Sequence, residues 1–482
     1  TGPVPLTPIQ HLFFEQNSRA PHHYNQAVLL KVKQPLDAEL LRRAVEQLLI
    51  HHDALNLRFA HDDAGWRQFN KVHEGDAPFE LINVSGVPEA QLPSAIEEAA
   101  AGLQSSLNLS EGPLLKVTLF NAGAGRQGRL LTVIHHMAVD GVSWRILLED
   151  LLNAYTQLDQ GREPVLPRKT TSFKTWAELL VQQAQSASLL DELPYWLAQA
   201  SGPFAPIPVD YSDGDNTRAS ARTVSVSLSE SETRSLLQEV PEVYHTQSND
   251  LLLAALVQAF AGWTGRRALL LALEGHGREE LAEDVDLSRT VGWFTSLFPV
   301  RLELEKAASA GDALKSIKEQ LRRIPQRGIG YGMLRYLSEG ASAQEQLARL
   351  RAQPMPEVSF NYLGQFDQAL PASSPFELAQ ESPGPLAAPL GHRRHLLEIT
   401  GSVIGNRLEI NWTYSESLHR RATVERLARS FLEELRALIA HCQLREAGGY
   451  TPSDFPLAEL EQDQLNTIFT QLDEEEFEAI DE

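Results

Sequence analysis

The feature that most constrains the fold is a strand that runs straight into a cluster of polar residues. Residues 129–134 read as a buried strand, and the sequence His135-His136-Met137-Ala138-Val139-Asp140-Gly141 follows at once. An amphipathic helix is then predicted from about Ser143 to Leu158. Polar groups at the end of a buried strand are costly unless they have partners or a chemical task. The chain therefore has to build a strand, loop and helix unit around them.

The second half of the sequence repeats this order with other residues. An apolar helix is predicted to reach Trp263, with Asn249 or Asp250 as its cap. The strand Ala268–Leu273 then leads into Glu274-Gly275-His276-Gly277-Arg278-Glu279. The sequence shows no short repeat of about 20 to 50 residues. Two similar lobes that face each other would explain why each half brings polar side chains to the end of a strand.

Other periodic segments indicate the extent of the two lobes. Asp37 is predicted to cap a helix that ends near His51, and Gly405-Asn406 is predicted to turn a hairpin between two alternating strands. Residues 164–215 are rich in Pro, Gly and short polar residues, which is typical of a domain junction. We expect an N-terminal lobe over 1–205, a C-terminal lobe over 206–457, and an acidic linker or docking tail over 458–482.

The composition narrows the classes of function. The formal net charge of −22 opposes binding to nucleic acid phosphates. The longest apolar run, Leu251–Trp263, is shorter than the roughly 20 residues that a membrane-spanning helix needs. Cys442 is the single cysteine, so an internal disulfide is impossible, and no secretory leader opens the sequence. We therefore expect no nucleic acid partner, no membrane role and a cytoplasmic location.

The pair His135-His136, followed by Asp140-Gly141, is suited to acid/base chemistry. An imidazole titrates near neutral pH and can be held in place by a nearby carboxylate. The alternative is that both histidines are satisfied core groups and that Asp140-Gly141 is a turn. The pairs His22-His23 and His51-His52 lack the Asp-Gly context, and we interpret those as structural.

Glu274 is a second candidate proton carrier, because it ends a buried strand beside two glycines. The alternative is a surface ion pair between Glu274 and Arg278. Arg278 could instead pair with Asp140 across the lobes, which would fix a loop rather than do chemistry.

Three other chemistries find little support. The segment 327–332 resembles a phosphate-cradling loop, but it does not follow a buried strand and lacks a Lys-Ser/Thr partner. Adjacent histidines are not the i, i+4 pair of a zinc helix, so no metal is needed. A nucleophile elbow is absent, and Cys442 in an amphipathic helix reads as a buried structural thiol.

Taken together, the motifs resemble the epimerization domain of nonribosomal peptide synthetases, over about residues 5–457. They occur in family order: Pro5-Leu6-Thr7-Pro8-Ile9-Gln10, His135 to Arg145, Glu274 to Glu279, Arg289 to Ser296, Gly328 to Gly332 and Ser359 to Gln365. The resemblance implies an α/β fold of the condensation-domain superfamily, with two chloramphenicol-acetyltransferase-like lobes in a V and the active site in a tunnel between them.

The resemblance also implies the roles of individual residues. His136 and Glu274 are expected to flank the substrate Cα and to exchange a proton with it. His135, Asp140, Gly141 and Arg278 are then supporting residues, and Asn361 and Tyr362 lie on a strand near the site. Tyr362 or a backbone N–H is a candidate donor to the enolate oxygen.

The implied activity is reversible L-to-D epimerization at Cα of an aminoacyl or peptidyl thioester. The substrate is presented on the phosphopantetheine arm of a separate carrier protein domain, normally upstream, so we expect no cofactor bound by this chain. The C-terminal tail is a candidate contact with a downstream module. The alternatives are a condensation domain, which forms amides with the same histidine motif, and a non-catalytic docking domain. Val142-Ser143-Trp144-Arg145 and the Glu274 segment favour epimerization.

Overall fold

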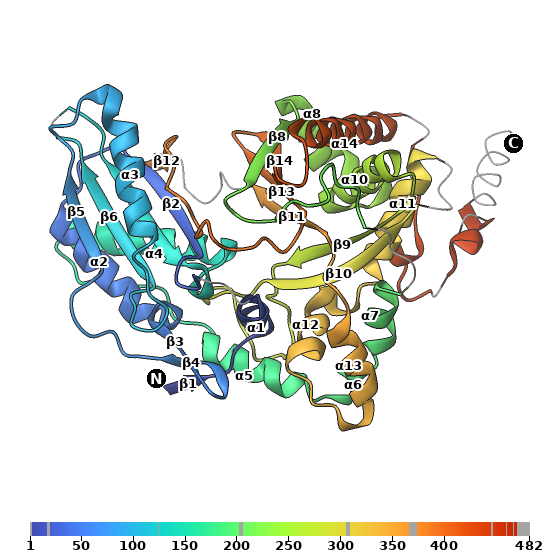
Figure 1. The fold of residues 1–482 in the computed structure, drawn as a ribbon, viewed down its shortest axis with the longest axis horizontal. Coiled ribbons are helices and arrows are strands. Elements are labelled where there is room, and N and C mark those ends of the chain that lie inside the picture. Colours follow the sequence, from blue (N-terminus) through green and yellow to red (C-terminus); the bar gives the residue numbers. More distant parts are fainter. Residues whose placement is uncertain are drawn as a thin grey trace, which may run out of the picture.

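The strands of the computed structural model gather in two large sheets, one in each of two lobes. The structure describes residues 2–16, 20–123, 125–201, 206–304, 309–365, 374–444, 447–458, 460–465 and 467–469. The lobes meet near helix α1 (Pro8–Glu15) and diverge toward α3 (Leu92–Gln104) and α8 (Glu230–Arg234), which gives a V-shaped outline (Figure 1). The expected α/β architecture of two lobes is confirmed.

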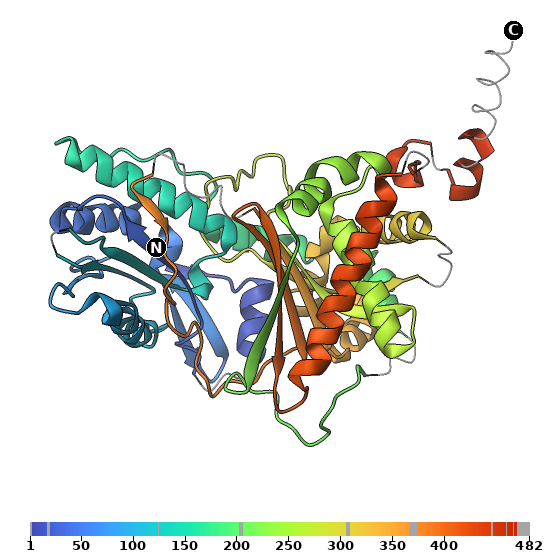
Figure 2. The same cartoon turned by 90° about the horizontal axis from the view of Figure 1, so that it is seen from above.

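The N-terminal lobe is built on a mixed five-stranded sheet that is covered on both faces. Helices α2 (Ala38–His51) and α4 (Gly141–Asp159) lie on one face, and Figure 2 shows α3 on the opposite side of the sheet from α4. A small antiparallel sheet lies at the edge of this lobe, in the order β1 (Gly2–Val4), β4 (Gly65–Asn70) and β3 (Leu57–Asp62). The order of the large sheet is β12 (Phe376–Leu378), β2 (Asn25–Val32), β7 (Arg129–His135), β6 (Leu115–Asn121) and β5 (Phe79–Asn83).

Local sequence signals explain the start and the packing of α2. The Asp37 carboxylate accepts hydrogen bonds from the backbone N–H groups of Glu39 and Leu40, at 2.8 and 3.0 Å, and so caps the helix as predicted. Leu41, Val45 and Leu48 recur at helical spacing and are buried against the sheet and α4.

The C-terminal lobe is a six-stranded mixed sheet with helices on one face. Its order is β10 (Ser296–Glu303), β9 (Ala268–Gly275), β11 (Val358–Gln365), β13 (Leu397–Ile404), β14 (Arg407–Ser415) and β8 (Ala221–Ser227). The predicted hairpin around Gly405-Asn406 joins β13 to β14. Helices α10 (Ser248–Thr264), α11 (Ala310–Arg322) and α14 (Arg421–Cys442) cover one face, and the short helices α8 and α9 (Val240–Tyr244) precede α10.

Side-chain alternation separates the two faces of this sheet. Trp412 on β14 is fully buried against Phe260 of α10 and Phe431 of α14. Because successive residues of a strand point to opposite faces, the neighbouring Thr413 points away from these helices. Thr413 pairs with Glu398 of β13, so a polar face is turned toward the N-terminal lobe.

The predicted cap of α10, Asn249 or Asp250, was wrong by two or three residues. The helix begins at Ser248 and its cap is Gln247. Asp250 lies inside the first turn, where its carboxylate accepts from the Gln247 backbone N–H at 2.7 Å and pairs with Arg322. A glutamine cap gives a weaker sequence signal than Asn or Asp, which is why the following residues were preferred.

Two segments cross between the lobes, so chain order and packing do not coincide. Strand β12 comes late in the sequence and pairs with β2 of the N-terminal sheet. Helices α5 (Phe173–Gln183), α6 (Ala187–Leu190) and α7 (Leu193–Gln199) precede residue 205, yet they pack with α12 (Ile329–Tyr336) and α13 (Gln344–Ala352). The expected boundary after residue 205 therefore separates α5, α6 and α7 from helices with which they pack. Residues 202–205 lie outside the described residues.

The expected tail over 458–482 is only partly described. Leu465 is 2% exposed, and the ring of Phe469 stacks on Tyr450, so the first part of this segment packs on the C-terminal lobe. Nearby, Lys318 and Asp454 form a buried ion pair at 2.6 Å. Residues 470–482, with most of the acidic run, lie outside the described residues. Across the described residues, none of the helices has both the length and the apolar character needed to cross a membrane.

Candidate active site

A cavity of about 350 Å³ lies between the two lobes and receives side chains from both. His136 reaches it from the end of β7, and Glu274 reaches it from the end of β9. The two sequence-predicted proton carriers are therefore brought to one space from two different sheets. The other lining residues used below are Tyr24, Arg218, Trp293, Thr295, Asn361, Arg394 and Glu398.

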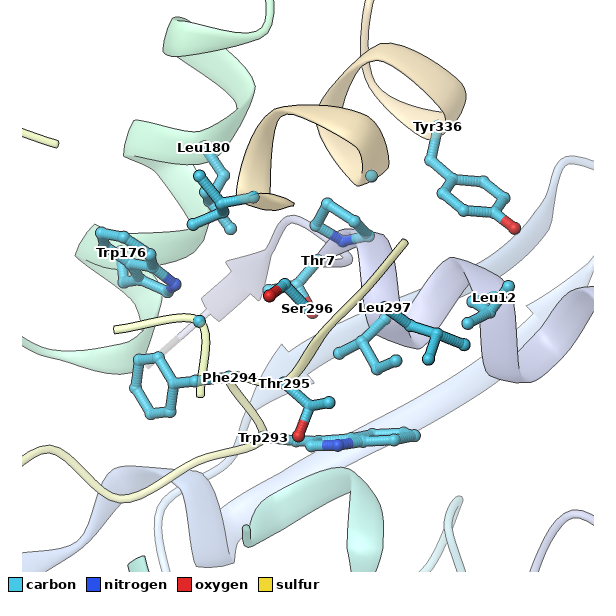
Figure 3. A pocket seen from close by; sticks show the side chains of 15 residues that line it. Thr7, Leu12, Trp176, Leu180, Trp293, Phe294, Thr295, Ser296, Leu297 and Tyr336 are labelled. Carbon is cyan, nitrogen blue, oxygen red and sulfur yellow. The ribbon is translucent and has the colours of Figure 1, made fainter. Parts of the chain in front are cut away.

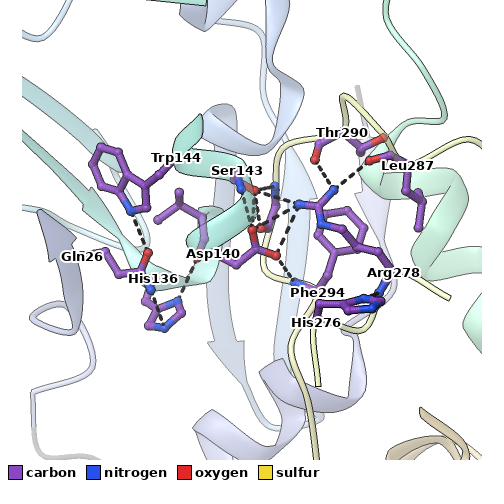
Figure 4. Close-up of polar contacts among 12 residues, drawn as sticks. Gln26, His136, Asp140, Ser143, Trp144, His276, Arg278, Leu287, Thr290 and Phe294 are labelled. Atoms are coloured by element: carbon purple, nitrogen blue, oxygen red, sulfur yellow. Dashed lines mark hydrogen bonds and ion pairs between the residues drawn. The ribbon is translucent and has the colours of Figure 1, made fainter. Parts of the chain in front are cut away.

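The Asp140 carboxylate connects the two lobes (Figure 4). It caps α4, since Oδ1 accepts from the Ser143 backbone N–H and from the Ser143 hydroxyl, both at 2.8 Å. Its other oxygen accepts from the backbone N–H of Phe294 at 3.2 Å, and the guanidinium of Arg278 lies 3.1 Å from Oδ1. Phe294 and Arg278 belong to the loop after β9, so a single carboxylate fixes a helix of one lobe to a loop of the other.

Arg278 extends the same contact into the loop. Its Nη1 donates to the carbonyl oxygens of Leu287 and Thr290, both at 2.8 Å, and its guanidinium lies 3.9 Å above the ring of Phe294. Burial lowers the pKa of Arg278, and Asp140 opposes that effect. The predicted pairing of Arg278 with Asp140 across the lobes is confirmed, and Arg278 acts as a structural anchor.

Gly277 makes the loop geometry possible. Its φ is +65°, and a Cβ at this position would overlap the carbonyl oxygen of Phe294. Glycine is therefore required for the loop to turn so close to its own returning segment. Gly141 differs, because the space around its Cβ position is open; it is the first residue of α4, next to the Asp140 cap.

His135 is a buried structural histidine. Its Nε2 donates to the carbonyl oxygen of Pro21 at 2.8 Å, and its Nδ1 accepts from the Met137 backbone N–H at 3.2 Å. Burial lowers its pKa to about 3, so the ring stays neutral. His135 is fully buried and does not line the cavity, which leaves it no part in proton transfer there.

His136 is half-buried and faces the cavity. Its Nδ1 lies 2.8 Å from the Val139 carbonyl oxygen, and its Nε2 lies 3.1 Å from the side-chain amide nitrogen of Gln26. The ring stacks on Tyr24 at a centroid distance of 5.3 Å, and the tilted ring of Trp293 lies 4.3 Å from it. Burial lowers the pKa of His136, while the Val139 carbonyl and Asp140 act against that effect.

Glu274 faces the cavity from the opposite lobe. Its Oε2 accepts a hydrogen bond from the Asn361 side-chain amide at 2.6 Å. The carboxyl is open to the cavity but lies deep between the lobes, so the surrounding protein raises its pKa to about 7, and the nearby Glu398 contributes to that rise. A carboxyl with such a pKa can both hold and release a proton near neutral pH.

The two residues expected on the neighbouring strand have different positions. Asn361 of β11 lines the cavity and holds Glu274. Tyr362 follows it, points to the other face of the sheet by alternation, and is not among the cavity-lining residues. Its hydroxyl is therefore not placed to reach an enolate oxygen in this cavity.

A second cavity, of about 30 Å³, adjoins the first (Figure 3). It lies between α1, α5, α12 and the segment 293–297, and most of its lining is apolar. It shares five residues with the larger cavity: Ile9, Leu12, Trp293, Thr295 and Leu297.

The segments set aside in the sequence have structural roles. His51, His52 and Asp150 have ligand atoms close enough for a metal ion, but the Asp150 oxygens already bind His52 at 2.9 Å and Arg289 at 2.5 Å. In the segment 327–332, the carboxylate of Glu192 packs against Gly330, where a phosphate would be repelled. Cys442 is buried in α14, and burial raises its pKa to about 11.

Several residues that line the cavity were missed in the sequence, and so was Gln26, which contacts His136 without lining the cavity. Tyr24 and Gln26 lie at or on β2, where they read as ordinary strand residues, and Trp293 reads as an apolar loop residue. Glu398 could have been found, because Glu398 and Thr400 alternate with Leu397 and Ile399 as the polar face of a strand. The positions of the others depend on packing between the lobes, which local patterns do not encode.

Comparisons with known proteins agree with this geometry. A family model described as the condensation domain matches residues 1–460. The chain belongs to the condensation domain family. A linear gramicidin synthase protein of Brevibacillus parabrevis is 49% identical over 466 residues, which cover 96% of this chain and 6% of that protein. This condensation-family chain spans 6 to 9% of the length of three linear gramicidin synthase proteins that it matches.

Two solved structures have a fold similar to that of this chain. The epimerization domain from the third module of tyrocidine synthetase B superimposes with a TM-score of 0.85 and 39% identity, over 92% of this chain and 98% of that one. The X-domain from teicoplanin biosynthesis has a TM-score of 0.70 and 20% identity, over 93% of this chain and 96% of that one, and shows the fold alone. The expected condensation-superfamily fold is confirmed.

Replacing Arg278 by Met should leave the buried Asp140 carboxylate without its cationic partner. We expect the free energy of unfolding to fall by about 3 to 5 kcal/mol, measured by urea denaturation. Arg421→Met is the matched control, because Arg421 and Glu425 form an exposed pair whose loss should change stability by about 0.5 kcal/mol or less. The double variant Asp140→Asn with Arg278→Met should be more stable than Arg278→Met alone. An Arg278→Met protein as stable as the control would contradict this role.

Proposed function

We propose that this condensation-family domain is an isomerase that inverts Cα of an aminoacyl or peptidyl thioester within nonribosomal peptide synthesis. The observation that carries the proposal is the pair of proton carriers, an imidazole from one lobe and a carboxyl from the other, at one cavity. Inversion needs a base on one side of a carbon and an acid on the other, and a cavity walled by both lobes can supply that geometry.

The protonation states support the same chemistry. Burial lowers the pKa of His136 and raises that of Glu274 to about 7. Near neutral pH the site therefore holds a neutral imidazole and a carboxyl that is protonated in a large fraction of the molecules, which are a base and an acid ready for use. A thioester makes its α-proton more acidic than an amide does. His136 removes that proton and Glu274 delivers another to the opposite face; the reverse reaction exchanges the two roles.

Condensation, the main alternative, is less well supported. Joining two carrier-bound groups by an amide bond gives no role to a second proton carrier opposite His136, whereas Glu274 is present and held by Asn361 at 2.6 Å. The solved relative with 39% identity is an epimerization domain. A non-catalytic docking domain would have no need for the shifted pKa of Glu274.

The substrate is proposed to arrive on the phosphopantetheine arm of a separate carrier domain. The curated relatives are far longer than this chain, so there is room for such a domain beside it in a protein of that kind. No cofactor bound by the chain itself is proposed, since proton transfer between side chains and substrate suffices. A contact of the C-terminal tail with a downstream module also stays a proposal, because residues 470–482 are outside the described part.

Removing either proton carrier should abolish inversion. We expect His136→Ala and Glu274→Gln to lower the rate of L-to-D conversion of a carrier-bound thioester by about 10²-fold or more, because each removes one of the two transfers. The measurement is chiral analysis of the amino acid released from the carrier. His51→Ala is the matched control, since His51 is a half-buried histidine of α2 away from the cavity. Inversion at the wild-type rate in Glu274→Gln would refute the two-carrier mechanism.

The pH dependence should report the raised pKa of Glu274. The form with neutral His136 and protonated Glu274 is lost below the pKa of His136 and above that of Glu274, so kcat/KM should fall above about pH 7. Removing the negative charge of Glu398 favours the Glu274 carboxylate, so Glu398→Gln should move this alkaline limb to lower pH. Glu433→Gln, an exposed change on α14, should leave it in place. An alkaline limb that stays at the same pH in Glu398→Gln would contradict the assignment of this limb to Glu274.

A further inference from the structure

A chain of three hydrogen bonds runs from Trp144 through Gln26 and the His136 ring to the Val139 carbonyl oxygen. The indole Nε1–H of Trp144 donates to the side-chain oxygen of Gln26 at 2.7 Å. The amide nitrogen of Gln26 lies 3.1 Å from Nε2 of His136, and Nδ1 of His136 lies 2.8 Å from the Val139 carbonyl oxygen. Figure 4 shows these groups in sequence from α4 to the His136 ring.

The partners at the two ends fix every proton in this chain. A carbonyl oxygen can only accept, so the proton of neutral His136 lies on Nδ1 and Nε2 keeps a lone pair. An indole N–H can only donate, so the Gln26 amide has to present its oxygen to Trp144 and its NH₂ group to His136. The Gln26 amide cannot turn over without losing both contacts.

We propose that Gln26, oriented by Trp144, is a positioning residue that keeps Nε2 of His136 unprotonated until substrate arrives and has to withdraw whenever that nitrogen carries a proton. The inference rests on the proposed function, because it concerns the nitrogen that takes the α-proton. Two N–H groups cannot form a hydrogen bond with each other, so the resting contact between the Gln26 NH₂ group and Nε2 is incompatible with the imidazolium form of His136. The network therefore stabilises the basic form of His136 and opposes its acid form.

Other groups around His136 do not replace this contact. From α4, the negative charge of Asp140 favours the imidazolium, but Arg278 neutralises it. From β7, His135 is neutral, and beside β2 the Tyr24 hydroxyl stays protonated because its pKa is raised to about 12. Glu274 faces the ring from β9 across the cavity, and Arg218 and Arg394 line the same cavity. Within the described chain, the hydrogen bond recorded at Nε2 is the one from Gln26.

The inference also explains two adjacent residues of the motif that follows Asp140-Gly141. Ser143 binds the loop of the other lobe, and Trp144, which is 3% exposed, reaches back to Gln26 of β2. Consecutive helix residues point in different directions, so one turn of α4 serves the lobe contact and the base at the same time.

The experiment follows the His136 ring directly by NMR of the whole domain labelled with ¹⁵N-histidine, with His136→Gln to assign the signals. The wild type should show His136 with Nδ1 protonated and Nε2 bare, and a pKa below 6.5. Gln26→Leu should raise this pKa by about one unit, since a donor to the neutral form is removed. Trp144→Phe should raise the His136 pKa less, because the Gln26 amide loses its orienting partner but is still present beside Nε2. The double variant should match Gln26→Leu.

The matched control is Asn25→Ala, one residue earlier on the same strand. The Asn25 side chain binds Gln104 of α3 on the other face of the sheet, so its loss should leave the pKa and tautomer of His136 unchanged. If the wild-type protein shows neutral His136 with its proton on Nε2, the proposal is overturned. This observation needs no variant. A Gln26→Leu protein that is folded and has an unchanged His136 pKa would also overturn the proposal.

The same variants separate this inference from the proposed function. If the domain inverts thioesters, the acid limb of its pH profile should move upward in Gln26→Leu by the shift seen in the NMR titration. If the NMR shift is found but no thioester is inverted or exchanged, the positioning role of Gln26 stands and the proposed epimerization fails. An acid limb that stays in place while the NMR pKa moves would show that Nε2 of His136 is not the base, and would overturn the catalytic part of the proposal.

Discussion

The site depends on one buried carboxylate, Asp140, which forms hydrogen bonds with residues of both lobes. On its own side it caps α4, the helix that follows the turn carrying His136. On the other side it holds Arg278 and the Phe294 backbone N–H, and thereby the loop that carries Trp293 against the His136 ring. Other links between the lobes, such as the Arg289–Asp150 ion pair and the pairing of β12 with β2, do not depend on Asp140, but without it the loop that carries Trp293 would lose its buried anchor beside His136.

The protein environment shifts the pKa values of the two proposed proton carriers in opposite directions, and this asymmetry suits the proposed mechanism. The surrounding protein disfavours the charged form of each group, even though the Glu274 carboxyl is open to the cavity, so the pKa of His136 falls while that of Glu274 rises to about 7. Both groups can therefore be neutral together near pH 7, one able to accept a proton and the other to give one. A network of hydrogen bonds from Trp144 through Gln26 acts on the imidazole in the same direction.

Local signals in the sequence predicted the elements and the ends of strands, but not the contacts between segments distant in the chain. The capped helix after Asp37, the hairpin at Gly405-Asn406 and the polar strand ends at His136 and Glu274 each follow from spacing that a few neighbouring residues determine. The pairing of β12 with β2 and the contact between Gln26 and His136 arise when segments more than a hundred residues apart meet. The loop contact of Arg278 with Asp140 was foreseen as one option, because opposite charges at two strand ends suggest a partner.

The measurement that tests the account most directly is deuterium incorporation by the wild-type domain in D₂O, with an L-aminoacyl thioester loaded on a carrier protein. Chiral separation and mass spectrometry of early time points should find one deuterium in the D-product, while unreacted L-substrate keeps its hydrogen, because the two faces are served by different groups. Deuterium appearing equally in both isomers from the start would contradict the two-carrier mechanism. No incorporation, together with amide formation when a second loaded carrier is supplied, would show a condensation domain instead.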